Sequence, residues 1–466
     1  MQKRRSVVVV GGGITGLSAA WYLQQGGASL DVTLVESESR LGGKVLTERG
    51  GGFLVEGGPE SFLAQKPWAL NLARELGIEG EVVRPTVSQV YLLYRGALHE
   101  IPEGLLGLVP VRPSALWKAS FLSFAGKARA SLEPLRPGRR SQDDESLRRF
   151  LTRRLGRQWA DRLGEPLMAG IHAGDGERLS MQALFPNLVA WECKYGSIAR
   201  ALRKEAPPVP HTKRVSPFVT FAGGAAALTG AIAQRLASVR IITGRRVMRL
   251  TKPGPSYLLT LDKGEQLTAE SIVLTTPAYA SAQILLELAP QASALLDKLG
   301  YASTASVTLA FKRSAVAHPL NGSGFIMARS ERQPFTACTW SSAKWAGRAP
   351  EGYALLRAFA GWSGDDSFMR QDDATLVRSV AEALRPLLSI QGEPEKTWVH
   401  RWVRAMPQYH VGHLAWIDSV QKALAAHPDV ALTGAAFHGV GLPDCVRQGK
   451  EAAERVLATA PAQGES

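Results

Sequence analysis

A glycine-rich turn near the amino terminus has the spacing of a phosphate-binding loop. Its six residues form the pattern G-x-G-x-x-G and are Gly11, Gly12, Gly13, Ile14, Thr15 and Gly16. Between a strand and a helix, such a turn lets the backbone approach a pyrophosphate at the helix N-terminus. Glu36 follows Gly16 by 20 positions, where a carboxylate binds ribose hydroxyls and repels a 2′-phosphate. The pattern predicts a dinucleotide site that disfavours NADP; the alternative is a glycine turn that only packs a helix on a strand.

Three later stretches also place glycines where a flat, charged cofactor needs close backbone contact. They are residues 36–44 (ESESRLGGK), 55–62 (VEGGPESF) and 433–445 (TGAAFHGVGLPDC). The first two resemble motifs of FAD proteins of the amine-oxidase type, in which Lys44 would supply a counter-charge. The third would open a helix whose N-terminal dipole suits the anionic edge of a reduced flavin. No second G-x-G-x-x-G occurs, so oxygen or another carrier is the expected electron acceptor.

The hydrophobic pattern around these motifs predicts the elements that position them. Residues 6–10 (SVVVV) and 31–35 indicate parallel strands buried on both faces, with a helix over 15–25 between them. A strand at 430–433 and a helix at 444–457 would frame the last motif in the same way. Together they predict a βαβ unit of the Rossmann-like kind.

The charge balance favours an anionic partner. Lys plus Arg total 55 and Asp plus Glu total 41, which leaves a net charge of +14. We expect no nucleic-acid partner, because the basic clusters at residues 3–5, 139–140 and 153–154 lack interleaved aromatic residues. The three cysteines lie far apart, which argues against a disulfide framework and fits a reducing cytoplasm. His410 and His413 have no third ligand pattern, so we expect a structural pair and no metal site.

Two apolar features bear on membrane attachment. The uncharged run of residues 6–30 is interrupted by glycines, so we expect a soluble strand-turn-helix in place of a bilayer helix. Trp117, Phe121 and Phe124 recur at helical spacing. Core packing is their expected role, and contact with a membrane surface is the alternative.

Nearly the whole chain resembles the porphyrinogen oxidase family, in particular the Gram-positive type that acts on coproporphyrinogen III. The resembling segments are residues 11–16, 58–62, 165–175 (EPLMAGIHAGD), 337–340 (ACTW), 401–402 (RW), 406–413 (MPQYHVGH) and 437–450. The nucleotide motifs alone would identify only an FAD oxidoreductase.

The resemblance implies a set of cofactor and substrate residues. The FAD contacts would fall on Gly11, Gly12, Gly13, Ile14, Thr15, Gly16, Glu36, Ser37, Lys44, Gly58, Pro59, Glu60, Ser61, Val247, Trp402, Val440, Gly441 and Leu442. Gly170 and Ile171 match the catalytic segment that the family places beside the flavin. His172 stands where the family often has Tyr. Lys66 and Arg95 are candidate carboxylate partners, although close relatives carry two adjacent Lys where this chain has Lys66 alone.

The implied reaction is oxidation of coproporphyrinogen III to coproporphyrin III in haem biosynthesis, with oxygen as acceptor. Three two-electron rounds, each with hydride transfer to the flavin and formation of hydrogen peroxide, would produce the aromatic macrocycle. The Gly170 carbonyl could accept pyrrole N–H bonds, and no acid-base dyad is required. A cytoplasmic location, peripheral membrane contact and transient contact with a downstream ferrochelatase are the expected surroundings.

The fold class that follows is α/β, and α+β overall. We expect a Rossmann-like FAD-binding domain, an antiparallel-sheet substrate domain and a helical lobe that could face a membrane. In chain order the parts are residues 1–85 (FAD-binding), 86–100 (substrate), 101–210 (helical lobe), 211–289 (FAD-binding), 290–425 (substrate) and 426–466 (FAD-binding).

Three alternatives stay open. Protoporphyrinogen IX oxidase shares the mechanism, but its substrate carries two propionates in place of four. An amine oxidase or carotenoid desaturase is more distant, and the former would need an aromatic cage beside the flavin. An FAD-bound adaptor that holds porphyrin without turning it over belongs to another class.

Overall fold

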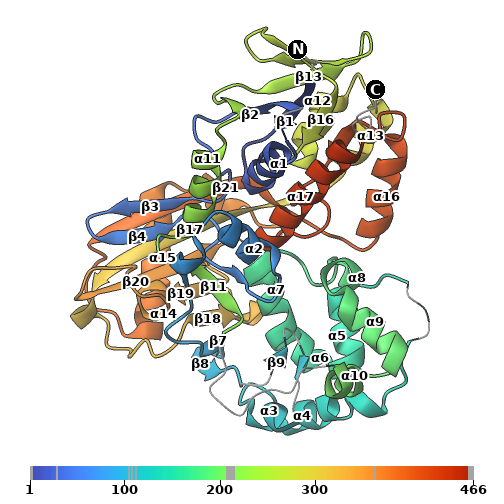
Figure 1. Cartoon of the computed structure of the whole chain (residues 1–466). Coiled ribbons are helices and arrows are strands. Elements are labelled where there is room, and N and C mark those ends of the chain that lie inside the picture. Colours follow the sequence, from blue (N-terminus) through green and yellow to red (C-terminus); the bar gives the residue numbers. More distant parts are fainter. Residues whose placement is uncertain are drawn as a thin grey trace.

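The computed structural model describes residues 4–27, 30–102, 105–106, 109–110, 113–139, 141, 143–205, 216–361 and 364–459. Figure 1 shows three regions: a layered α/β part with both termini at the top, a sheet at the left and a helical lobe below. The proline-rich residues 207–210 (PPVP), which the sequence predicts to be a linker, lie outside the described residues. No described helix is both long enough and apolar enough to cross a bilayer.

A five-stranded parallel sheet forms the centre of the α/β part. Its order is β12 (Val239–Ile242), β2 (Leu30–Val35), β1 (Arg5–Val10), β16 (Ser271–Leu274) and β22 (Val430–Leu432). Every neighbouring pair is parallel. Val7 and Val9 enter one hydrophobic cluster, whereas Val8 and Val10 enter another. The run of four valines is therefore explained by a strand that is covered on both faces.

Helices cover one face of this sheet, and a mixed layer covers the other. The first layer contains α1 (Ile14–Gln25), α2 (Trp68–Glu75), α11 (Ala226–Arg235) and α17 (Leu442–Ala458). The second contains β13 (Val247–Thr251), β14 (Tyr257–Leu261), β15 (Gln266–Ala269), α12 (Ala278–Leu285), α13 (Pro290–Asp297) and α16 (His413–Ala423). A Cβ on Gly449 would lie 2.4 Å from the Thr15 oxygen, so glycine lets α17 approach α1 closely. The first and last glycine motifs are thereby brought to the same edge.

A seven-stranded sheet forms the second part. Its order is β21 (Lys396–Pro407), β17 (Tyr301–Lys312), β20 (Tyr353–Ala360), β19 (Ala337–Trp340), β18 (Gly324–Met327), β7 (Val90–Tyr94) and β8 (Ala97–Glu100). Helix α15 (Asp373–Leu388) packs on one face, through the cluster that contains Leu356 and Leu384. The sheet is antiparallel as predicted except for β7 and β18, which pair in parallel. These two strands are far apart in the sequence, so no hairpin turn dictates their relative direction.

Shorter elements complete the parts described so far and include short segments of the lobe. They are β3 (Thr47–Gly50), β4 (Phe53–Glu56), β5 (Phe62–Leu63), β6 (Val82–Val83), β9 (Leu105–Leu106), β10 (Val109–Pro110), α14 (Ser341–Lys344), β11 (Phe218–Phe221), and 3-10 turns at Glu79–Glu81, Glu133–Leu135, Arg313–Ala315, Arg329–Glu331 and Ser367–Arg370. Strand β11 pairs with β5 and β6, which ties the returning chain to the first glycine-rich part.

The helical lobe is built from short helices. They are α3 (Pro113–Lys118), α4 (Phe124–Ser131), α5 (Leu147–Leu155), α6 (Arg157–Trp159), the π-helical turn Ala160–Gly164, α7 (Glu165–His172), α8 (Met181–Leu184), α9 (Pro186–Tyr195) and α10 (Ile198–Glu205). Residues 147–163 have a helical pattern rich in Arg, but the helix breaks at Gly156, where a φ of 96° cannot continue α5. Phe121 is buried as expected, but Trp117 and Phe124 are exposed. Helix α3 ends at Lys118 and α4 begins at Phe124, so the three aromatic residues do not share the buried face of one helix.

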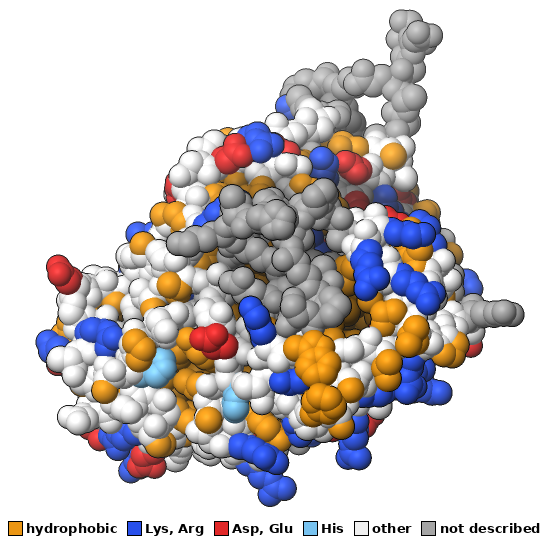
Figure 2. Space-filling view, turned by 90° about the horizontal axis from the view of Figure 1, so that it is seen from below, with side chains coloured by type: hydrophobic (Ala, Val, Ile, Leu, Met, Phe, Trp, Pro, Cys, Tyr) orange, Lys and Arg blue, Asp and Glu red, His pale blue; other side chains and the backbone are white. Residues whose placement is uncertain are grey.

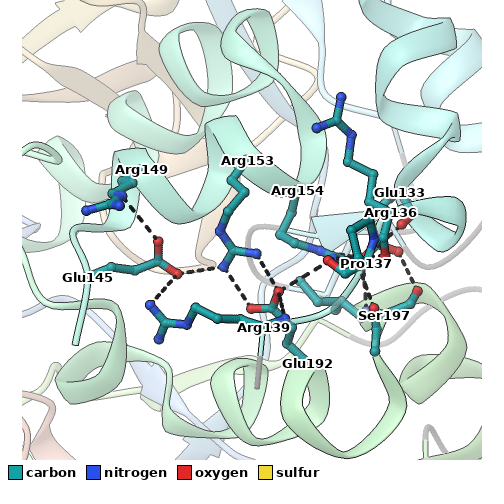
Figure 3. A network of polar contacts seen from close by, with 12 residues as sticks. Glu133, Arg136, Pro137, Arg139, Glu145, Arg149, Arg153, Arg154, Glu192 and Ser197 are labelled. Carbon is teal, nitrogen blue, oxygen red and sulfur yellow. Dashed lines mark hydrogen bonds and ion pairs between the residues drawn. The ribbon is translucent and has the colours of Figure 1, made fainter. Parts of the chain in front are cut away.

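The basic cluster at residues 153–154 pairs with carboxylates of this lobe (Figure 3). The Arg154 side chain is fully buried and pairs with Glu133 and Glu192. Arg153 pairs with Glu145 at 2.6 Å and also with Glu192. These guanidinium groups are neutralised internally, so they do not present a basic surface to an anionic partner.

Candidate functional site

The four glycine motifs meet at the carboxyl edge of the parallel sheet. Gly13 and Gly42 form a β-bridge, and the Gly42 N–H donates to the Gly12 carbonyl at 2.8 Å. A Cβ on Gly58 would lie only 1.7 Å from the Lys44 oxygen, which places the third motif directly against the second. The tertiary structure thus assembles one site from segments that lie far apart in the sequence.

The N-terminus of α1 is open toward this site. A Cβ on Gly16 would lie 1.8 Å from the Gly11 oxygen, so the turn is closed tightly behind the helix. Gly13 caps α1 without a side-chain hydrogen bond, and the first turn contains no acidic residue. A Cβ on Gly13 would meet no described atom closer than 4.0 Å. Bare N–H groups at a helix N-terminus with free space beside them fit a diphosphate.

Glu36 lies where a ribose would meet this turn. Its buried carboxylate accepts the Gly12 N–H at 2.6 Å, and Ser37 Oγ and the Glu38 N–H donate to its other oxygen. The oxygen that accepts only the Gly12 N–H keeps a lone pair for a further donor. The Arg245 N–H donates to the Glu36 carbonyl at 3.0 Å, which brings the start of β13, with Val247, to the same end of the site.

The loop of residues 58–61 is held by side chains of the seven-stranded sheet. Trp402 Nε1 donates to the carbonyl of residue 57 at 2.8 Å, and Arg357 Nη2 donates to the carbonyl of residue 58 at 2.7 Å. Glu60 pairs with Lys344 at 2.8 Å. Burial acts to raise the pKa of Glu60, but Lys344 and Arg357 hold that pKa below its ordinary value. The loop is therefore fixed by charged groups beneath it.

Arg357 is a functional candidate that the motif search missed. It is buried on β20, and its Nε and Nη1 have no hydrogen-bond partner among the described residues. A lone arginine inside the apolar run YALLRAFA was the signal that could have identified it. Pro59 and Ser61 lie half-buried on either side of Glu60 in the loop that Arg357 supports.

The second helix N-terminus at the site belongs to α17. Residues 440–442 lead into it, Gly441 is its cap, and no side chain caps it. Lys66 Nζ binds both carboxylate oxygens of Asp444 at 2.6 and 2.7 Å in its first turn. The Lys44 side chain, near the Cys445 thiol, has its pKa lowered by burial. Lys66 is neutralised by Asp444, so the backbone N–H groups at the uncapped start of α17 are the feature that suits an anionic flavin edge.

The predicted substrate residues are only partly brought together. Burial, with Lys66 nearby, lowers the pKa of His172 to about 4, so His172 is neutral at pH 7 and can offer hydrogen bonds but no charge. Lys66 is already paired with Asp444. Arg95 lies at the turn between β7 and β8 with a φ of 54°, and its N–H binds Glu331. No described contact joins Arg95 to Lys66 or His172.

Gly170 and Ile171 end α7 beside the seven-stranded sheet. A Cβ on Gly170 would make ordinary contacts with Ile326 at 3.8 Å and Ala337 at 3.9 Å. The Ile171 side chain is 51% exposed, which is unusual for a large aliphatic group on a packed lobe. Its exposure offers an apolar contact for a flat ligand.

Comparison with known proteins agrees with this geometry. The model of the family described as flavin containing amine oxidoreductase matches residues 14–457. The chain is 38% identical to coproporphyrinogen III oxidase of Bacillus subtilis (strain 168), over 97% of this chain and 98% of that protein. It is 30% identical to chloroplastic protoporphyrinogen oxidase 1 of Arabidopsis thaliana, over 96% of this chain and 87% of that protein.

A solved structure is similar along the whole chain. It is a protein from Exiguobacterium sp. 255-15 described as a protoporphyrinogen oxidase, with a TM-score of 0.87 and 33% identity, covering 98% of this chain and 99% of that one. The match extends well beyond the nucleotide motifs and includes the seven-stranded sheet and the helical lobe. The chain therefore belongs to the flavin-containing amine oxidoreductase family and is an oxidoreductase with a flavin cofactor.

Proposed function

We propose that this protein is an FAD-dependent oxidase that converts coproporphyrinogen III to coproporphyrin III, with oxygen as the electron acceptor. The observation that carries the proposal is the 38% identity to the Bacillus subtilis coproporphyrinogen III oxidase over nearly the full length of both chains. The assembled site agrees with it, because α1 and α17 present open N-termini there, and His172, next to Ile171, lies near Lys66, which pairs with Asp444 in the first turn of α17.

The residues of the site divide into those that hold the cofactor and those that orient the substrate. When bound, FAD would accept hydride from a meso carbon of the porphyrinogen. The N-terminus of α1 would bind the diphosphate and Glu36 would bind the ribose, while residues 58–61 and 440–442 would hold the ring. Gly170 and Ile171 form the opposite wall, where the Gly170 carbonyl accepts pyrrole N–H groups. We also propose that the chain divides into the FAD-binding, substrate and helical parts that the sequence predicts.

The substrate assignment is tested by comparing kcat/KM for coproporphyrinogen III and protoporphyrinogen IX in air. We expect the tetracarboxylic substrate to be preferred by about tenfold or more, since each additional charge-assisted contact is worth about 1.5 kcal/mol or more. About three molecules of peroxide per porphyrin, and no turnover without oxygen, would support the acceptor. A preference for the dicarboxylic substrate would contradict the assignment, and a yellow protein that oxidises neither would favour the adaptor.

We also propose that the helical lobe touches an anionic membrane surface. Within residues 113–135 of the lobe, Trp117, Phe124, Leu132 and Leu135 are exposed large apolar residues, and the ring centroids of the first two lie 5.5 Å apart. The segment 113–132 contains Lys and Arg but no Asp or Glu. Figure 2 shows hydrophobic side chains gathered among Lys and Arg on the underside of the molecule. Exposed apolar side chains surrounded by basic ones are typical of contact with an anionic membrane surface.

Vesicle co-sedimentation measures this contact. Replacing Phe124, which is 75% exposed, by Ser should weaken binding to phosphatidylglycerol vesicles about thirtyfold, because about 2 kcal/mol of ring burial is lost. Leu286→Ser, an exposed residue on the α/β part, is the matched control and should bind like the wild type. Equal binding by both variants, or equal binding to phosphatidylcholine, would contradict the contact.

The product defines the enzyme that must follow. A free porphyrin receives its metal from another enzyme, so we propose transient contact with a ferrochelatase in the cytoplasm. A crosslinked complex that forms only in the presence of porphyrin would support this contact.

A further inference from the structure

A short segment between β21 and α16 docks the helical lobe onto the rest of the molecule. We call residues 408–413 the connecting segment. The Ser180 N–H donates to the Tyr409 carbonyl at 2.7 Å, and the Val411 N–H donates to the Arg178 carbonyl at 2.9 Å. These bonds pair the segment with the chain that follows α7, as a short strand pair would. In Figure 1 the lobe lies below α17, with α7 as its nearest helix.

Side chains extend this docking to the substrate wall. Gln408 is buried, and its Nε2 donates to the His172 carbonyl at 3.0 Å. Asp144 of the lobe accepts the Gly412 N–H and the Ser180 hydroxyl, both at 2.8 Å. The C-terminal end of α7 is therefore fixed by the connecting segment as well as by its own lobe.

The same segment holds the flavin turn, which we define as residues 434–441. The buried Tyr409 hydroxyl donates to the Ala435 carbonyl at 2.7 Å and accepts the Gly439 N–H at 3.0 Å. One phenol thus bridges the two sides of the turn. Gly439 has a φ of 116°, a backbone conformation that favours glycine. A Cβ there would lie 2.6 Å from Asp444, so this turn leaves no space for a larger residue.

His413 contacts both the Tyr409 ring and the flavin turn. Its ring stacks on Tyr409 with centroids 3.9 Å apart and planes inclined by 13°. Burial lowers the pKa of His413 to about 4, so the ring is neutral, and Nε2 meets the Phe437 carbonyl at 3.1 Å. Because a carbonyl only accepts, this nitrogen carries the proton. Tyr409 and His413 together fix three backbone groups of the flavin turn.

We infer that the connecting segment couples the flavin turn to the substrate wall, with Tyr409 as the positioning residue on one side and Gln408 on the other. The inference rests on the proposed flavin position. Cofactor binding to the turn fixes Tyr409, and the backbone of the segment carries that constraint to Ser180 and His172. The connecting segment then fixes the distance between the flavin turn and the end of α7, so these two sides of the macrocycle site do not move independently.

Tyr409→Phe tests the flavin side of the connection. The variant keeps the ring stack but removes the hydroxyl, which leaves the Ala435 carbonyl and the Gly439 N–H unpaired. We expect FAD to bind about tenfold more weakly in fluorescence titrations of flavin-depleted protein, as the loss of one to two buried hydrogen bonds implies. Tyr257→Phe is the matched control, because that buried tyrosine lies on β14 and packs in the cluster on the other side of the parallel sheet, with no hydrogen bond to the flavin turn. It should bind FAD like the wild type.

Gln408→Met tests the substrate side with a different readout. Amide hydrogen exchange is followed in the flavin turn and in α7, with and without FAD. In the wild type we expect FAD to slow exchange in both. In Gln408→Met the turn should still respond while α7 no longer does, and in Tyr409→Phe both responses should be reduced.

Each outcome has one meaning. Unchanged FAD affinity in Tyr409→Phe, together with a wild-type response of α7 in both variants, overturns the coupling. If FAD does not slow exchange in the flavin turn of the wild type, the proposed flavin position is wrong. If Tyr409→Phe does not fold, Gln408→Met alone decides, because its loss or retention of the α7 response bears directly on the connection.

Discussion

Replacing Gly16 by Ala should yield folded protein that is nearly free of flavin. The new Cβ would lie 1.8 Å from the Gly11 oxygen and 2.9 Å from the Thr275 hydroxyl, so the turn must open. Opening it moves the N–H groups that would bind the diphosphate. Strain of about 1–3 kcal/mol in this turn corresponds to a loss of affinity of roughly tenfold to a hundredfold.

Flavin content measures this effect. The ratio of flavin absorbance to protein absorbance in the purified variant is compared with the wild type, and FAD affinity is then titrated. Gly230→Ala in α11 is the matched control, because a Cβ there meets nothing within 4 Å and alanine favours the helix. Wild-type flavin content in Gly16→Ala would mean that this turn is not the cofactor site.

Replacing Arg154 by Met should destabilise the helical lobe by about 3–5 kcal/mol, the range for breaking a buried ion pair on one side. The side chain is fully buried and serves Glu133, Glu192 and the carbonyls of Pro137 and Gly196. Glu133, 2% exposed, would then keep its charge without its cation. Urea unfolding followed by proteolysis of the lobe would show the loss.

Arg149→Met is the matched control, because it removes a charge of the same helix from an exposed position. Arg149 is on the same helix, but its side chain is 78% exposed and its ion pair with Glu145 is 4.0 Å long. Removing such a surface pair costs about 0–1 kcal/mol. Equal destabilisation by the two variants would contradict the view that the buried network in Figure 3 stabilises the lobe.

Most of the cofactor side could be predicted from the sequence because its signals are local. The glycines, the run of valines and Glu36 lie within 30 residues, and each has a backbone reason for its place. The strands at 257–261 and 430–433 were also predictable from alternation and turns. The parallel pairing of β7 with β18 was not, because strand direction across a long connection has no local signal.

Charged side chains were the hardest to place. Arg153 and Arg154 form a basic pair in the sequence, yet their carboxylate partners are up to 39 residues away and lie inside the lobe. Lys66 pairs with Asp444, which is 378 positions further along the chain. The partner of a long charged side chain depends on which opposite charge lies near it in the folded protein. Separation along the sequence does not give that distance.

The sequence by itself determined the family, the flavin cofactor and the architecture of a parallel sheet with a second sheet and a helical lobe. The cofactor and the architecture follow from short-range patterns that the backbone must satisfy wherever the segment lies, whereas the family follows from a resemblance along nearly the whole chain. Only the tertiary structure decided that Arg357 supports the loop of residues 58–61 and that Tyr409 bridges the flavin turn. Those roles depend on side chains that meet across separate elements, and such meetings are fixed by packing of the whole chain.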